Sequence, residues 1–367
     1  MSRARSLCVL LGAAVVAACS DGTSPAPTVT VTSVSPSSGP LAGGTAVTLT
    51  GANFPATVDS VRVGTGRLGS LVRVSGTQLT GTTPAGSAAG ATDVTVYTTS
   101  AGSGTCTGCF TYNPAATWTT LTAGEGHTCG VTSGGAAYCW GRNGTGELGD
   151  GSTTRRMTPV AVAGELTFQS VTAGYGHTCG VTSGGVAYSW GSNFWGQLGH
   201  GDTLLASTPV AVAGGLTFSS LTAGAGHTCG VTSGGAAAYC WGQNNVGELG
   251  DRSTTRRMTP VAVAGGLTFA AVTAGFYHTC GVTSVGAGFC WGGDSLGVLG
   301  DGSSIWMRTA PVAVVGGLTF ASVTAGATHT CGVTSSGAAY CWGRDFYGEL
   351  GDGSTTDRPT PVAVVNP

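Results

Sequence analysis

Cysteine is the residue type in this sequence whose spacing points most directly to chemistry. Folding a segment of about ten residues around a turn places its two ends opposite each other on neighbouring strands, about 4.5–5.5 Å apart at Cα and within disulfide range. Paired thiols that bind zinc are the alternative, but zinc needs four converging ligands. We predict four disulfides of this kind: Cys129–Cys139, Cys229–Cys240, Cys280–Cys290 and Cys331–Cys341. We expect Cys179 to be unpaired, because Ser189 stands at its partner position.

A further pair, Cys106 and Cys109, lies in a Cys-Thr-Gly-Cys segment. Such a pair does redox chemistry when a helix N-terminus lowers the pKa of one thiol. Here Gly, Ser and Thr surround the pair and a predicted strand follows it. We therefore expect a small structural disulfide that closes a hairpin.

One histidine recurs at a fixed position in the C-terminal two thirds of the chain. Five imidazoles around a common axis suggest a metal site, but zinc needs about four ligands within about 2.1 Å and an acidic group to orient them. We expect structural histidines that hydrogen-bond to backbone, and no metal. The residues are His127, His177, His227, His278 and His329.

Acidic residues also recur in polar loops. Calcium binding would require six or more converging oxygens, and catalysis normally needs one asymmetric site rather than several near copies. We expect turn or blade-to-blade roles, no catalytic residue and no cofactor, since the chain carries no P-loop, Gly-x-Ser-x-Gly or His-Glu-x-x-His motif. The loop residues are Glu147, Asp150, Glu248, Asp251, Asp301, Glu349 and Asp352.

Composition limits the elements that can position these residues. The 367 residues include 66 Gly but only 8% charged side chains, with a formal net charge of -2. Glycine destabilises helix interiors by about 1 kcal/mol per position, whereas Thr and Val favour short strands joined by turns. A nucleic-acid-binding face would need a clear excess of basic residues. We therefore expect an all-β protein that does not bind nucleic acid.

The N-terminus predicts export. Arg3 and Arg5 precede an apolar run that is too short to span a bilayer but suits a signal peptide over residues 1–18. The segment Val16-Ala17-Ala18-Cys19 resembles a bacterial lipobox, which implies lipidation of Cys19 and a tether over 19–27. Ser20 rather than Asp after the cysteine points to the outer membrane or cell surface. A secreted protein without a lipid is the alternative.

Residues 28–113 alternate short apolar stretches with turns, which predicts a β-sandwich. The segments VTSVSPSSGPLAGGTAVTLTGANF (31–54), TTPAG (82–86) and FTY (110–112) resemble an IPT/TIG immunoglobulin-like domain. Such domains usually serve as spacers or binding modules. This segment has few basic residues, which argues against binding of nucleic acid. We therefore interpret it as a stalk.

The remainder, 118–367, consists of five copies of one unit of about fifty residues, each with four β-like segments. Tandem four-stranded units of this kind are typical of propeller blades. The segment GHTCGVTSGGAAYCWGRNGTGELGDGS (126–152) resembles the regulator of chromosome condensation (RCC1) repeat, which implies a β-propeller. The units run 118–167, 168–217, 218–268, 269–319 and 320–367.

Both ends of the repeat array are cut at the same point of the unit. A whole number of units suits a ring in which the last strand pairs with the first blade and no edge is left open. We therefore expect a closed five-bladed ring. An open arc, or a truncated form of the family's usual seven-bladed ring that is completed by oligomerisation, is the alternative.

The units differ mainly at loop positions, where several carry aromatic side chains. Exposed aromatics are enriched at interface hot spots, although some of them fill gaps between blades instead. We expect a binding face formed by these loops. Its candidate residues are Tyr175, Phe194, Trp195, Phe276, Tyr277, Trp306, Phe346 and Tyr347.

These features favour a non-catalytic recognition or scaffold protein that binds a protein or glycan partner through its propeller loops and contacts the membrane only through its lipid. One alternative is an enzyme or lectin that acts on envelope polysaccharide or peptidoglycan, and another is a purely structural surface protein. The RCC1 resemblance also suggests exchange-factor activity on a nuclear GTPase, but the signal sequence contradicts that role.

Overall fold

The structure, a computed structural model, describes residues 27–365 except 235 and 304. The predicted signal peptide and the lipidation site Cys19 lie outside the described residues. The chain divides into two compact units, 1–115 and 116–367. In the described part of the chain, no helix has the length and apolar character needed to cross a membrane.

The first unit is a β-sandwich. One sheet has the order β1-β3-β7-β6 and the other the order β2-β9-β8-β4-β5, in which β2 and β9 are parallel. The strands are β1 (Thr30–Ser35), β2 (Ser38–Pro40), β3 (Ala46–Ala52), β4 (Ser60–Val63), β5 (Gly66–Arg67), β6 (Gly69–Ser75), β7 (Gln78–Thr82), β8 (Gly90–Thr98) and β9 (Gly102–Asn113).

The core of this sandwich follows the alternation of apolar residues along the strands. Leu49 and Leu79 from one sheet and Val94, Val96 and Phe110 from the other are completely buried. Side chains at every second position of a strand face the same way, so each strand contributes one apolar face. The sequence therefore specifies both the sandwich and its core.

The Cys106–Cys109 disulfide does not close a hairpin, as we had expected, but lies within strand β9. The pairing of β8 with β9 shifts at this point, between Thr92 and Val94, so the Cys-Thr-Gly-Cys segment forms a bulge. The backbone N–H of Gly108 donates to Asp93 Oδ1 at 2.9 Å. The extra residues of the bulge are thus fixed by the disulfide and by one side-chain hydrogen bond.

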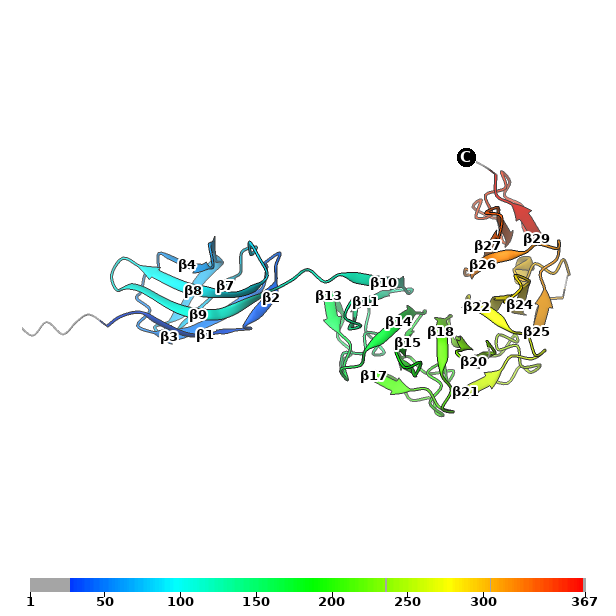
Figure 1. Cartoon of the computed structure of the whole chain (residues 1–367), viewed down its shortest axis with the longest axis horizontal. Coiled ribbons are helices and arrows are strands. Elements are labelled where there is room, and N and C mark those ends of the chain that lie inside the picture. The colour runs from blue at the N-terminus through cyan, green and yellow to red at the C-terminus, as the bar shows by residue number, and fades with distance from the viewer. Residues whose placement is uncertain (1–26, 235, 304, 366–367) are drawn as a thin grey trace, which may run out of the picture. The chain divides into compact units, whose positions relative to one another are not determined.

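The second unit contains five blades, each a four-stranded antiparallel sheet in chain order (Figure 1). Blade 4 also holds a short 3-10 turn, η1 (Ser295–Gly297). The strands of blades 1 and 2 are β10 (Trp118–Ala123), β11 (His127–Thr132), β12 (Ala137–Gly141), β13 (Arg156–Ala161), β14 (Phe168–Ala173), β15 (His177–Thr182), β16 (Ala187–Gly191) and β17 (Ala206–Ala211). Those of blades 3 to 5 are β18 (Phe218–Ala223), β19 (His227–Thr232), β20 (Ala238–Gly242), β21 (Arg257–Ala262), β22 (Phe269–Ala274), β23 (His278–Thr283), β24 (Gly288–Gly293), β25 (Met307–Ala313), β26 (Phe320–Ala325), β27 (His329–Thr334), β28 (Ala339–Gly343) and β29 (Arg358–Ala363).

The second and third strands of each blade carry the predicted cysteine pairs in direct register. In blade 1, Cys129 pairs with Cys139 across the ladder with a Cα–Cα distance of 4.1 Å. The structure joins the same pairs that the spacing predicts, in blades 1, 3, 4 and 5. In blade 2 the Ser189 hydroxyl lies 3.0 Å from the Sγ atom of Cys179, which is buried and free.

Neighbouring blades are joined along their innermost strands by backbone hydrogen bonds. The N–H of Tyr175 in blade 2 donates to the carbonyl of Gly224 in blade 3, and the N–H of Ala225 in turn donates to Gly275 in blade 4. A Cβ atom placed on Gly224 would lie 2.6 Å from the Gly275 carbonyl oxygen. Glycine is therefore required at this position because the next blade approaches too closely for any side chain.

The blades follow one another along an open arc (Figure 1). The innermost-strand hydrogen bonds link blades 1 to 2, 2 to 3, 3 to 4 and 4 to 5. Among the described residues of this unit, none links blade 5 back to blade 1. The expected closed five-bladed ring is therefore wrong for this structure, because each joint sets the rotation to the next blade and five such joints leave a gap.

The close approach at Gly224 gives a stability prediction with an internal control. Gly224→Ala should destabilise the protein by about 1–3 kcal/mol, since the added methyl group overpacks the joint. Gly326→Ala, at the same position in blade 5, should cost much less, because there the nearest atom to a new Cβ is in its own blade at 3.1 Å. Urea denaturation of the two variants measures the difference. Equal losses would contradict the close-approach explanation.

Candidate binding site on the loop face

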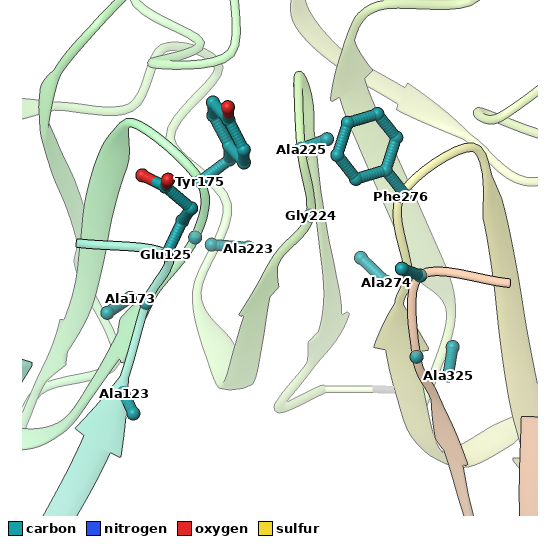
Figure 2. Close-up of a pocket in the computed structure, with 15 residues that line it drawn as sticks. Ala123, Glu125, Ala173, Tyr175, Ala223, Gly224, Ala225, Ala274, Phe276 and Ala325 are labelled. Atoms are coloured by element: carbon teal, nitrogen blue, oxygen red, sulfur yellow. The ribbon is translucent and has the colours of Figure 1, made fainter. Parts of the chain in front are cut away.

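The Ala-Gly-X segments at the ends of the innermost strands line a cavity of about 280 Å³ (Figure 2). All five blades contribute to it, and its walls are mainly alanine methyl groups and backbone. Only the X position varies. Its residues are Glu125, Tyr175, Ala225, Phe276 and Ala327.

Two aromatic rings stand at the mouth of this cavity. Tyr175 and Phe276 lie on either side of Ala225 in Figure 2, and their ring centroids are 5.7 Å apart in an edge-to-face arrangement. Phe276 also packs edge-to-face against Tyr277 at 4.6 Å. The structure thus brings three of the candidate residues together from blades 2 and 4, across the loop of blade 3.

A second cavity, of about 290 Å³, shares Tyr175 and Ala225 with the first. Phe194 and Trp195 line it, with exposed fractions of 70% and 38%. The N–H of Trp195 donates to Oε1 of the buried Gln197 at 2.9 Å, which fixes the loop. Apolar ring faces here lie beside amide and hydroxyl groups, an arrangement that suits an amphipathic ligand.

The remaining candidates do not join this group. Phe346 and Tyr347 form their own edge-to-face pair in blade 5, at 4.7 Å, with the Arg344 guanidinium over both rings. Trp306 is 62% exposed, and it has no aromatic contact among the described residues. The eight predicted residues therefore separate into one cluster of five, one pair and one isolated tryptophan.

Arg142 lies between the two cavities, and sequence inspection did not single it out. Its guanidinium binds Glu125 at 2.6 Å and Glu147 at 2.9 Å, and it sits 5.6 Å from the centroid of the Tyr175 ring. Burial opposes ionisation of Glu147, but hydrogen bonds from backbone amides and from Arg142 together hold its pKa below the usual value. Both acidic residues here share one arginine, so the group keeps a formal charge of -1.

The recurring histidines belong to the joints between blades, where they bond a threonine side chain of the next blade and not the backbone that we expected. His127 Nε2 lies 2.8 Å from Thr178 Oγ1, and that hydroxyl donates to the carbonyl of Glu147 at 2.8 Å. Because the threonine gives its proton to the carbonyl, the histidine must donate Nε2–H, and its buried Nδ1 has no partner. Within the described residues, no group of three or more His, Cys, Asp or Glu side chains is placed to hold a metal ion.

The same arrangement recurs at the next joints, and burial dominates its electrostatics. Desolvation lowers the pKa of His127 to about 4, of His177 and His227 to about 3, and of His278 to about 4. These imidazoles are therefore neutral at neutral pH. They serve as hydrogen-bond donors inside the joints and are not general bases.

The acidic loop residues hold their own blades together. In four blades an aspartate binds the arginine at or near the start of the fourth strand, at 2.6–2.8 Å. The pairs are Asp150–Arg156, Asp251–Arg257, Asp301–Arg308 and Asp352–Arg358. This is the turn role expected from the repetition of the aspartates.

Comparison with family models agrees with this architecture. Residues 29–113 match the model described as IPT/TIG domain. One model described as regulator of chromosome condensation (RCC1) repeat matches 134–181, 184–231, 237–282 and 336–367, and a second matches 118–147, 168–197, 218–248 and 320–349. Together the repeat matches cover more than half of the chain. The first match, 134–181, begins after β11 of blade 1 and ends in β15 of blade 2. The repeat unit of the family model therefore spans the joint between two structural blades.

Several known proteins are similar to this chain in sequence or in fold. Ultraviolet-B receptor UVR8 of Arabidopsis thaliana is 34% identical over 131 residues, which are 35% of this chain and 30% of the receptor. The chain thus spans less than a third of that relative. Human WBSCR16 has a TM-score of 0.62 at 17% identity, over 92% of this chain and 83% of that one, which shows the fold. Prp20p of Saccharomyces cerevisiae has a TM-score of 0.47 at 18% identity, over 68% and 77% of the two chains.

The buried neutral histidines predict how stability depends on pH. Their pKa values in the folded protein lie below the unfolded value of about 6.5, so the unfolded state binds more protons and stability falls as the pH drops from about 6.5 towards 4. Each histidine should lower the folding equilibrium constant by up to about tenfold per pH unit in this window. His227→Gln, whose amide can still donate to Thr279, should make the dependence less steep. Urea denaturation at several pH values measures it, and an unchanged slope would contradict a neutral His227.

Proposed function

We propose that this chain, which belongs to the family of RCC1-repeat proteins and carries an IPT/TIG domain, is an exported, lipid-anchored and non-catalytic recognition protein. In this proposal the IPT/TIG domain acts as a spacer, and the blade array binds a protein or glycan partner through its loop face. A propeller of RCC1 repeats is consistent with a binding or scaffold role. The partner, the export and the anchor are parts of the proposal.

The observation that carries the proposal is the group of aromatic side chains around the two cavities, whose linings share Tyr175 and Ala225. Tyr175, Phe194 and Trp195 surround one cavity, and Tyr175 with Phe276 stands over the other. In blade 1 the positions of Phe194 and Trp195 hold Gly144 and Thr145, so blade 2 departs from the repeat here. Large exposed rings on a rigid scaffold favour binding, because they supply apolar contact area at a small cost in side-chain entropy.

Export is supported by two features. The signal-like segment over 1–18 ends in Cys19 within a lipobox-like sequence. Among the described residues, ten cysteines form five disulfides, a density that suits an oxidising compartment. These features support the proposal of a location at the outer membrane or cell surface, with a secreted form as the alternative.

A catalytic role is disfavoured by the chemistry of the site. Glu125 is the one carboxylate in the described lining of the two cavities, and it is bound to Arg142 at 2.6 Å. Acid–base chemistry needs a titratable group that is free to exchange protons with its substrate. The site offers stacking surfaces and hydrogen bonds, which are the means of recognition.

The test is capture of a partner by matched variants. The chain carrying Cys19→Ser, which cannot be lipidated at this position, would be immobilised and exposed to envelope extract and culture medium. Replacing Tyr175, Phe194 and Trp195 by Ala should weaken retention of the partner about tenfold or more, because such rings are typical hot spots.

The control is Trp306→Ala, which removes a ring of comparable exposure outside the cluster and should leave retention unchanged. Equal retention by the triple variant and the parent, or retention by neither, would reject the loop-face proposal. Equal loss in the triple variant and in Trp306→Ala would show general hydrophobic adhesion instead of a site.

A further inference from the structure

The four joints between blades are built from one set of parts, and the two ends of the array each carry half of that set. In every joint the earlier blade supplies a histidine and a backbone carbonyl, and the later blade supplies a threonine and a tryptophan. In the joint between blades 2 and 3, the Gln197 carbonyl accepts from Thr228 Oγ1 at 2.8 Å and from Trp241 Nε1 at 2.9 Å. His177 Nε2 lies 2.9 Å from the same threonine hydroxyl.

Blade 5 presents the first half of a joint, and no described residue of the blade array lies opposite it. We call this the blade-5 face: His329, the Glu349 carbonyl and the loop glycines Gly348, Gly351 and Gly353. At the earlier joints the glycines equivalent to Gly348 and Gly351 lie against the next blade. A Cβ on Gly300 would be 2.7 Å from the Trp342 indole, whereas a Cβ on Gly348 would meet no described atom within 4 Å and one on Gly351 would meet only Val364 of its own blade.

Blade 1 presents the other half, which we call the blade-1 face: Thr128, Trp140 and Met157. Trp140 is half-buried, whereas the equivalent Trp190, Trp241, Trp291 and Trp342 are completely buried. Thr128 is also half-buried, and the equivalent Thr178 and Thr228 are fully buried. Met157 is 84% exposed; at its position in blade 2 the Ser207 carbonyl accepts from the N–H of Gly151 at 2.9 Å.

We propose that the blade-5 face of one copy of this chain binds the blade-1 face of a second copy, in the geometry of the internal joints. The occupant is identified by complementarity: the second copy carries the threonine, the tryptophan and the backbone carbonyl that the blade-5 face is built to receive. The new contact continues an interface that the chain already forms four times. It buries Trp140 against Gly351 and places Thr128 between His329 and the Glu349 carbonyl.

This contact is heterologous, because two different surfaces meet, and each copy of a dimer keeps one of its two faces free. Such contacts form a closed ring when the rotation between copies closes, and a helical array when it does not. We expect an open, concentration-dependent series of oligomers, because each added copy brings one further free face.

Two single-face variants test the proposal in the full chain carrying Cys19→Ser. Thr324→Lys alters blade 5: Thr324 is exposed, and at its position in blade 3 the Thr222 hydroxyl accepts the N–H of Ala274 in the next blade at 3.1 Å. The lysine therefore places a charge in the new contact without touching an internal joint. Trp140→Ala removes the main apolar group of the blade-1 face.

Analytical ultracentrifugation over a wide range of protein concentration gives the readout. The parent should form dimers and larger species, and each variant alone should be monomeric. An equimolar mixture of the two variants should form dimers and nothing larger, because it contains one intact face of each kind that can pair. Trp306→Ala, the control for an exposed aromatic outside both faces, should assemble like the parent.

A parent that stays monomeric throughout the range would overturn the proposal. So would a mixture that stays monomeric while the parent assembles, because the parent would then be using other surfaces. Circular dichroism and cooperative urea unfolding of each variant, compared with the parent, show that a loss of assembly is not a loss of folding.

Discussion

The blade array depends on one shared acceptor, the backbone carbonyl that each blade offers to the next. At residues 147, 197, 248 and 298 this carbonyl accepts both a threonine hydroxyl and a tryptophan indole N–H from the following blade. A buried carbonyl has two lone pairs, and both are used here. The indole can reach it because the loop glycine beneath, such as Gly149, has no side chain. Repeated glycine, threonine and tryptophan are thus parts of one joint.

The histidine is the last part of this joint, and the joint requires its imidazole to be neutral. Its Nε2–H saturates the threonine oxygen, and its Nδ1 is buried without a partner in blades 1 to 3. A second proton there would place an unpaired charge in a buried interface, which is costly. The joint therefore holds neutral imidazole, and burial is the cause of the lowered histidine pKa values.

Much of this architecture could be predicted from the sequence because the repeat makes its pattern visible five times. The four-stranded blade, the opposed cysteines and the Ser189 exception follow from spacing alone. Whether the blades close into a ring could not be predicted from the sequence. The angle between blades is set by side-chain packing at the joints, and this packing leaves no periodic signal in the sequence. The bulge at Cys106 was missed because a Cys-Thr-Gly-Cys segment fits a hairpin turn and a strand bulge equally well. The grouping of Tyr175, Phe194 and Trp195 around Arg142 depends on contacts across blades, which spacing along the chain does not encode.

Exchange of the tryptophan indole protons with solvent tests the joint most directly. The chain has eight tryptophans, and nuclear magnetic resonance resolves their indole N–H signals. In the Thr324→Lys chain, kept dilute, the four indoles bound to joint carbonyls, those of Trp190, Trp241, Trp291 and Trp342, should exchange slowly, and that of Trp140 should exchange fast. Fast exchange at the four joint tryptophans would contradict the shared-carbonyl joint. Slow exchange at Trp140 would contradict an array whose first blade is uncovered.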